Sequence, residues 1–158
     1  MASAAAAITD PGISRVVALL GGRSTFDRPF STALEAHESI QRGFPSKSLL
    51  IFVHDFPTIG REDTIDKVVG VSLRTFQRHK KAGAKDRLNR EQSGKLYKAA
   101  EIVAKAIDVL GSRDAAERFL EAPALALDGQ RPVDLLSTPA GAEMVEKHLG
   151  RLDYGVYT

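Results

Sequence analysis

The feature that most constrains the fold is a stripe of apolar residues, spaced three and four apart, within residues 91–110. Side chains at this spacing lie on one face of an α-helix, which completes a turn in about 3.6 residues. The stripe consists of Leu96, Ala99, Ala100, Val103, Ile107 and Leu110. No stretch of the chain alternates apolar and polar residues as a half-buried strand would. We therefore expect an all-α fold in which this is the longest helix.

Capping and helix-breaking residues divide the rest of the chain into shorter helices. Gly43 and Gly111 are placed to end helices, whereas Thr138 followed by Pro139 is typical of a helix start. The apolar run at 49–53 is continuous, so periodicity does not separate helix from strand, and the neighbouring helices favour a helix. The predicted helices cover residues 13–20, 32–42, 46–54, 61–69, 72–81, 112–121 and 138–149.

Spacing also predicts which side chains of these helices share a face. Leu34, His37 and Ile40 are expected on one side of their helix. In the last two helices we expect inward-facing side chains at Ala115, Phe119, Met144, Val145 and Leu149, with Ala116 as a further candidate.

The charge of the chain is concentrated in its middle. The net charge is only +2, but residues 61–90 hold four carboxylates against nine basic side chains. The basic residues are Arg61, Lys67, Arg74, Arg78, Lys80, Lys81, Lys85, Arg87 and Arg90. A basic segment in an otherwise balanced chain is the charge pattern of a nucleic-acid contact, although a solvated charged surface has the same pattern.

Residues 64–81 have the pattern of a helix-turn-helix. Gly70 supplies a left-handed backbone conformation at a tight turn, Val71 fills the space between the helices, and Ser72 caps the second helix. Leu73 and Phe76 are expected to hold the second helix onto the first. The opposite face would contact operator DNA through Ser72, Arg74, Thr75, Gln77, Arg78 and Lys81. The alternative is an ordinary helical corner with a solvated basic face.

The sequence offers no pattern typical of a catalytic or metal site. There is no cysteine, and His37, His54, His79 and His148 are scattered without a metal-ligand spacing. We expect no enzymatic activity, no cofactor and no metal, with His37 in the core or on a helix surface and His79 on the DNA-binding helix. No apolar run approaches the roughly 18 residues of a membrane span. We expect a cytoplasmic protein with no membrane partner.

The C-terminal segment combines a turn, a short proline-initiated helix and an aromatic end. The sequence motifs, in order, are Gly43-Phe44-Pro45, Gly70-Val71-Ser72-Leu73-Arg74-Thr75-Phe76-Gln77-Arg78, Leu88-Asn89-Arg90-Glu91-Gln92-Ser93, Ala116-Glu117-Arg118-Phe119-Leu120, Leu127-Asp128-Gly129-Gln130-Arg131-Pro132-Val133-Asp134-Leu135-Leu136, Thr138, Gly141 and Arg151-Leu152-Asp153-Tyr154-Gly155-Val156-Tyr157. This arrangement resembles the Xre/MbcA/ParS antitoxins, which pair with RES-domain toxins. The chain departs from the family at Phe119, where tryptophan is common, and at Ala124, where a polar residue is usual.

We expect the chain to consist of three parts. Residues 1–12 are expected to be a disordered tail rather than a signal peptide, and 13–111 a helical domain with the helix-turn-helix at about 61–82. Residues 112–158 are then the toxin-binding domain. The resemblance further implies a type II antitoxin that blocks the active site of an NAD-consuming or ADP-ribosylating RES toxin and represses its own operon.

We expect one set of residues to contact the toxin: Arg131, Asp134, Arg151, Asp153, Tyr154, Val156, Tyr157 and Thr158. In this hypothesis the tail 151–158 closes the toxin's NAD pocket, supported by Arg131 and Asp134 beside it. The alternative is that its aromatic residues cover this protein's own C-terminal helices.

Palindromic operator DNA would require two recognition helices about 34–36 Å apart, so we also expect a homodimer. Its interface is expected on the stripe within 96–110 or on the N-terminal helices. A different function remains open, that of a stand-alone transcriptional regulator whose C-terminal domain senses a ligand.

Overall fold

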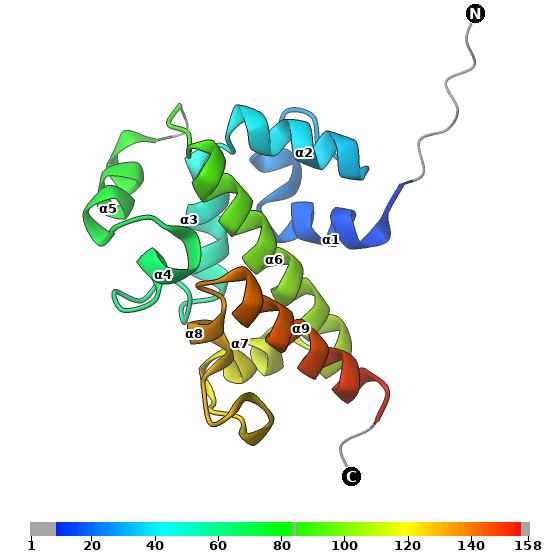
Figure 1. Ribbon diagram of the computed structural model, residues 1–158. Helices are drawn as coiled ribbons and strands as arrows, with labels where there is room; N and C mark the ends of the chain where they lie inside the picture. Colours follow the sequence, from blue (N-terminus) through cyan, green and yellow to red (C-terminus); the bar gives the residue numbers. More distant parts are fainter. Residues whose placement is uncertain (1–8, 84, 156–158) are drawn as a thin grey trace, which may run out of the picture.

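The computed structural model describes residues 9–83 and 85–155, and one long helix runs through the middle of it (Figure 1). This helix, α6 (Arg90–Leu110), packs against α1 (Pro11–Leu19), α2 (Ala33–Arg42), α4 (Ile65–Val69), α7 (Arg113–Glu121) and α9 (Pro139–Asp153). Within the described residues there is no strand, only two isolated bridges, Pro45 with Arg87 and Ala124 with Gln130. The predicted all-α fold is confirmed.

The remaining elements are short. They are η1 (Gly22–Ser24), α3 (Ser46–Asp55), α5 (Leu73–Ala82), η2 (Leu125–Leu127) and α8 (Pro132–Leu135). None of the described helices combines the length and the apolar character needed to cross a bilayer.

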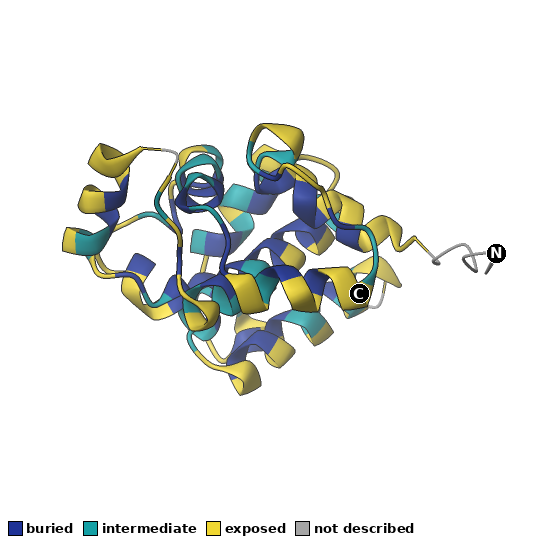
Figure 2. Ribbon diagram, turned by 90° about the horizontal axis from the view of Figure 1, so that it is seen from above, coloured by how far each residue is buried: buried dark blue, intermediate teal, exposed yellow. Residues whose placement is uncertain are grey.

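The apolar side chains of α6 form the centre of the core. Leu96, Ala100 and Val103 of the predicted stripe are fully buried, and so are Ile102 and Ala106 outside it. Figure 2 shows buried residues along the inner faces of the helices around the centre of the molecule. The buried arc of α6 is wider than the stripe because other helices cover it from several sides. Four of the six stripe residues are therefore covered by helices of this chain and only Ile107 and Leu110 are half-buried, so the expectation that the stripe could serve as a dimer interface is wrong.

Side-chain caps set the ends of several helices. Asn89 and Gln92 form a capping box at the start of α6, in which the Asn89 side chain accepts from the Gln92 N–H at 2.8 Å. The Gln92 side chain accepts in return from the Asn89 N–H at 3.0 Å. Thr32, Ser112 and Thr138 cap α2, α7 and α9 as their sequence context predicts. These bonds satisfy N–H groups that the first turn of a helix leaves without a partner.

Helix α4 is shorter than predicted, because it begins at Ile65 and not at Arg61. The buried Thr64 hydroxyl lies 2.6 Å from the Thr58 carbonyl oxygen and 3.1 Å from that of Ile59. A threonine hydroxyl that bonds to preceding carbonyls favours a turn over a helix. The segment before α4 is therefore a compact loop.

Some predicted helix faces are wrong. Helix α7 buries Ala116, which was a further candidate, and Leu120, whereas the predicted Ala115 and Phe119 are only half-buried. Met144 in α9 is 39% exposed, and Leu34, for which only a shared helix side was predicted, is 66% exposed. A shift of one residue turns a helix face by about 100°, and in short helices too few apolar positions are present to fix the face.

Gly141, in the first turn of α9, lies against the backbone of α8. A Cβ atom at this position would overlap the carbonyl oxygen of Leu135. Gly150, near the end of the same helix, has space, since the atom nearest to a Cβ at that position would be Lys105 Nζ, at 3.8 Å.

We predict that Gly141→Ala lowers the free energy of unfolding by about 1–3 kcal/mol, because α8 must move away from α9. The matched control, Gly150→Ala, should raise it by ~0.5–1 kcal/mol, since alanine is the better helix former. Urea unfolding followed by circular dichroism measures both. Equal midpoints for the two variants would contradict the close α8–α9 contact.

Candidate functional site

Helices α4 and α5 are joined by a three-residue turn. Gly70 has φ 75° and ψ 26°, in the left-handed region that glycine adopts without strain. Val71 is fully buried, and the Ser72 hydroxyl accepts from the Thr75 N–H at 3.1 Å. The three roles predicted for the turn residues are confirmed. The turn sets the direction in which α5 leaves the core.

Helix α5 is anchored mainly on α3, whereas the sequence analysis expected it to rest on the helix before it. Phe76 is 8% exposed and lines a hollow with Leu50 and Val53 of α3. Leu73 is partly buried against the same core. The apolar face of α5 is thus packed against the core.

The opposite face of α5 is open to solvent. Ser72, Arg74, Gln77, Arg78 and Lys81 are exposed and Thr75 is half-buried. Within the described part of the chain, no carboxylate lies within ion-pair distance of Arg74, Arg78 or Lys81. The structure therefore brings all six sequence-predicted DNA-contact residues together on one short element, with three unpaired cations among them.

A buried histidine holds the end of α5. The His79 side chain is 2% exposed, and its Nδ1 bonds to the Asp86 carboxylate. This bond lowers the pKa of Asp86 below its usual value. His79 lies on the helix for which it was predicted, but on its buried side, because it comes three residues after Phe76 and so shares the buried face of that residue. The three-residue spacing from Phe76 is the feature of the sequence that could have predicted the burial of His79.

Asp86 also connects the end of α5 to α3 through its main chain. Its main-chain carbonyl oxygen accepts from the Ser46 N–H at 2.9 Å, at the start of α3. Two residues later the Leu88 N–H donates to Phe44 O at 2.9 Å. Both ends of α5 are consequently fixed, the first by the turn and the last by the loop that leads to α6.

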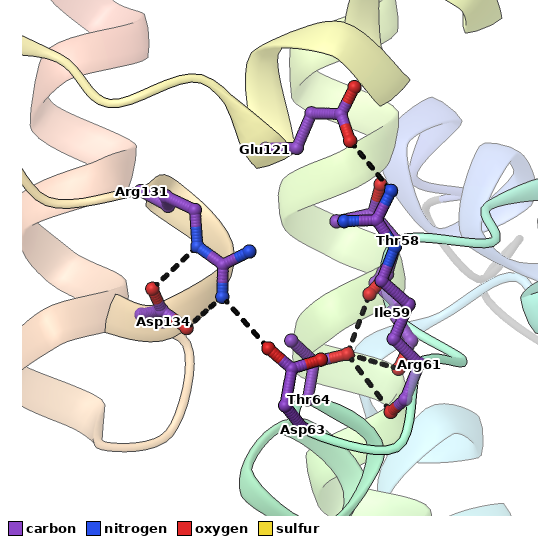
Figure 3. A network of polar contacts seen from close by, with 8 residues as sticks. All are labelled: Thr58, Ile59, Arg61, Asp63, Thr64, Glu121, Arg131 and Asp134. Carbon is purple, nitrogen blue, oxygen red and sulfur yellow. Dashed lines mark hydrogen bonds and ion pairs between the residues drawn. The ribbon is translucent and has the colours of Figure 1, made fainter.

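A network of polar contacts connects the loop before α4 with the C-terminal helices (Figure 3). Arg131 donates to both carboxylate oxygens of Asp134, at 2.8 and 2.9 Å, and to Asp63 at 3.3 Å. Its hydrogen bond lowers the pKa of Asp134. Arg61 donates to Glu121 of α7 at 2.8 Å. The paired charges hold α7 and α8 against the segment that leads into α4.

Two further contacts join the same parts. The Thr58 N–H donates to the Glu117 carboxylate at 2.7 Å, and Thr58 is fully buried. Arg113, at the start of α7, donates to Asp55 at 3.1 Å. The sequence analysis missed these contacts because they join residues about 60 positions apart.

The predicted toxin-contact residues do not lie together. Leu135 of α8 touches the first turn of α9, whereas Arg151, Asp153 and Tyr154 lie at or after its last turn. Fifteen helical residues separate the two ends by roughly 22 Å. The expectation that Arg131 and Asp134 lie beside the tail and support it is therefore wrong.

The tail itself begins later than predicted. The helix α9 continues to Asp153, and Arg151 and Asp153 are exposed in its last turn. Tyr154 is 84% exposed, so this tyrosine does not cover the protein's own helices. Val156, Tyr157 and Thr158 lie outside the described residues.

Large apolar side chains are exposed mainly in the C-terminal third of the chain. Leu125 is 97% exposed, and Met144 and Tyr154 belong to the same third. Leu125 lies in the loop closed by the Ala124–Gln130 bridge, where Asp128 and Gly129 adopt positive φ. The sequence analysis predicted no helix over residues 123–130 and singled out no residue there.

The described residues contain no cluster of three or more side chains able to hold a metal ion. Comparison with known proteins gives two matches. Residues 105–155 match the family model of the antitoxin Xre/MbcA/ParS C-terminal toxin-binding domain. The chain is also similar to the antitoxin Xre of Photorhabdus laumondii, with 22% identity over 129 residues, which covers 81% of this chain and 84% of that protein.

The bond between Asp86 and His79 predicts a pH dependence of stability. The pKa of Asp86 is lower in the folded protein than its ordinary 3.8. A lowered carboxylate pKa contributes stability above the unfolded value, and this contribution is lost as the pH falls through the folded value.

We therefore predict that Asp86→Asn is less stable than the parent chain near pH 6, and that the difference shrinks as the pH falls below about 4. Urea midpoints between pH 6 and pH 2.5 measure this change. Asp128→Asn, which removes an exposed carboxylate from a loop, is the control. A difference between Asp86→Asn and parent that stays constant over this range would show that the charge of Asp86 does not act through the folded state.

Proposed function

We propose that this chain, which belongs to the Xre/MbcA/ParS antitoxin family, neutralises a RES-type toxin and represses its own operon. Antitoxins of this family are binding proteins and not enzymes. The proposal rests on one observation, that the family match and the exposed apolar side chains fall in the same segment of the chain. Residues 105–155, which match the toxin-binding domain, also hold three of the four large apolar side chains that are exposed among the described residues.

The toxin-contact surface in this proposal consists of Leu125, Met144, Tyr154 and the tail after α9. Removing exposed apolar side chains from water favours association, and tyrosine is one of the residue types that most often dominate the energetics of an interface. Arg131 and Asp134 remain candidates. Their polar atoms already bond to one another, so their contribution would be to hold α8 in place.

Tyr154 is the residue of the tail whose position favours insertion into a partner. It follows directly on the rigid end of α9 and is 84% exposed. A pocket for NAD must accommodate aromatic bases and a pyrophosphate, and tyrosine and arginine are side chains with matching chemistry. We propose that the tail from Tyr154 onward, together with Arg151, obstructs the NAD site of a RES toxin.

DNA recognition is assigned to α5. Its exposed arginines can bond guanine bidentately, and Gln77 can pair with adenine. One such helix covers few base pairs, so the proposal includes a homodimer on a palindromic operator. With the stripe of α6 buried, the exposed Leu34 makes α2 the favoured place for the dimer contact.

For the DNA contact, we predict that Arg74→Ala and Arg78→Ala each weaken operator binding by about 1–3 kcal/mol, because each removes a contact to base edges. Fluorescence anisotropy at fixed salt measures the loss. Stability and toxin neutralisation should not change, since both side chains are exposed and unpaired. The control Arg118→Ala/Lys147→Ala removes two exposed charges elsewhere. Equal affinity of the α5 double variant and this control would remove α5 from the DNA site.

For the toxin contact, we predict that deleting residues 154–158 leaves α9 and DNA binding intact but abolishes protection of cellular NAD against a cognate RES toxin. Tyr154→Ala should weaken toxin binding by about 2 kcal/mol, or roughly 30-fold, whereas Tyr154→Phe keeps the ring and most of the affinity. Calorimetric titration with the toxin gives the affinities. Full protection by the truncated chain would show that the tail is not the inhibitory element.

A further inference from the structure

A cleft with a strongly basic lining is formed without any residue of α5. It has a volume of about 670 Å³ and opens between η1, the end of α2 and the segment after α5. Five of its lining side chains are cations: Arg28, Arg42, Lys47, Lys85 and Arg87. Asp27 is the single carboxylate in the lining. The cations come from four separate segments of the chain, so the sequence alone does not reveal the cluster.

The walls of the cleft are held in place by the backbone. Pro45 and Arg87 form a bridge that fastens the connection between α5 and α6 to the residue before α3. Gly43 approaches this connection so closely that a Cβ atom would overlap the carbonyl oxygen of Leu88. The Phe26 ring packs edge-on against Phe44, with centroids 5.4 Å apart. The cations therefore project from a fixed frame.

Two of the cations are positioned by neutral partners. Lys47 Nζ donates to the Ser24 carbonyl oxygen at 2.8 Å, and Arg87 Nη1 donates to that of Gly43 at 2.7 Å. Within the described residues, none of the five forms an ion pair with a carboxylate. Glu35 and Glu38 line a neighbouring hollow that shares Arg28 and Arg42. The cleft itself keeps an excess of positive charge.

Like charges held together repel, and a concave site concentrates their field, so such a cleft attracts anions. Guanidinium and ammonium groups are the protein donors best suited to phosphate oxygens. The aromatic residue of the lining, Phe26, is 5% exposed and offers no face on which a base could stack. The ligand chemistry that fits is therefore a chain of phosphates rather than a nucleobase.

We propose that this cleft is a second binding site, specific for consecutive phosphate groups. Two sources can supply them: the backbone of DNA that is bound at α5, or a free oligophosphate. The first source rests on the proposed DNA-binding function and the second does not. The contact between His79 and Asp86 joins α5 to the loop that carries Lys85 and Arg87, so the position of α5 relative to this wall of the cleft is fixed.

The test uses the full chain and the variant Arg28→Gln/Lys85→Gln. Both side chains are exposed and make no hydrogen bond to the described protein, so the fold does not depend on them. The control Arg118→Gln/Lys147→Gln removes the same charge from α7 and α9. The first arm titrates inorganic tripolyphosphate and follows amide NMR shifts of residues 24–28, 42–47 and 85–87. The second arm measures binding of duplex DNA as a function of salt.

In the first arm we expect saturable shifts with the parent chain and the control, and an affinity at least tenfold lower for the cleft variant. In the second arm, a DNA source predicts that the negative slope of log K against log salt becomes less steep by about 2 in the cleft variant, or 0.9 for each lost phosphate contact. An unchanged slope with lost tripolyphosphate binding assigns the cleft to a free oligophosphate. Unchanged behaviour of the cleft variant in both arms overturns the proposal. The tripolyphosphate arm remains decisive even if α5 does not bind DNA.

Discussion

The enclosure of α6 by five other helices is the interaction on which the remaining structure depends. Its buried alanines, among them Ala99, Ala100 and Ala106, let neighbouring helices approach closely, while Leu96, Ile102 and Val103 fill the spaces between them. Helices from both halves of the chain pack on it, so the boundary that the sequence analysis places after residue 111 separates parts of one core. That division into domains stays a prediction.

Two surfaces of different chemistry lie around this core, and contacts between helices fix their positions relative to each other. The exposed cations of α5 lie on one side, and the matched C-terminal domain carries the exposed apolar residues. The contacts of Arg61 with Glu121 and of Arg131 with Asp63 connect the loop before α4 to α7 and α8. Ion pairs at the surface stabilise only weakly, but here they are joined by the Thr58–Glu117 hydrogen bond to a buried residue. Their main effect is to fix the geometry between the two surfaces.

The proposed antitoxin function uses this arrangement without any catalytic group. A binding protein needs accessible side chains on a rigid support, and α5 and α9 both meet that condition. Helix α5 is held at its two ends, by Val71 at the turn and by His79 on Asp86. Helix α9 carries Tyr154 out of the core at its end. The basic cleft adds a third surface, formed by segments that the C-terminal family match does not include.

The sequence by itself determined the elements that depend on local chemistry. Periodicity marked α6, the Gly70-Val71-Ser72 turn was predicted correctly, and the cap at Thr138 was found because a cap bonds within three residues. Only the tertiary structure decided which face each short helix buries, that His79 turns inward, and that Arg131 lies far from the tail. Only the structure brought Arg28, Arg42, Lys47, Lys85 and Arg87 to one cleft. These outcomes depend on contacts between distant residues, which local spacing does not encode.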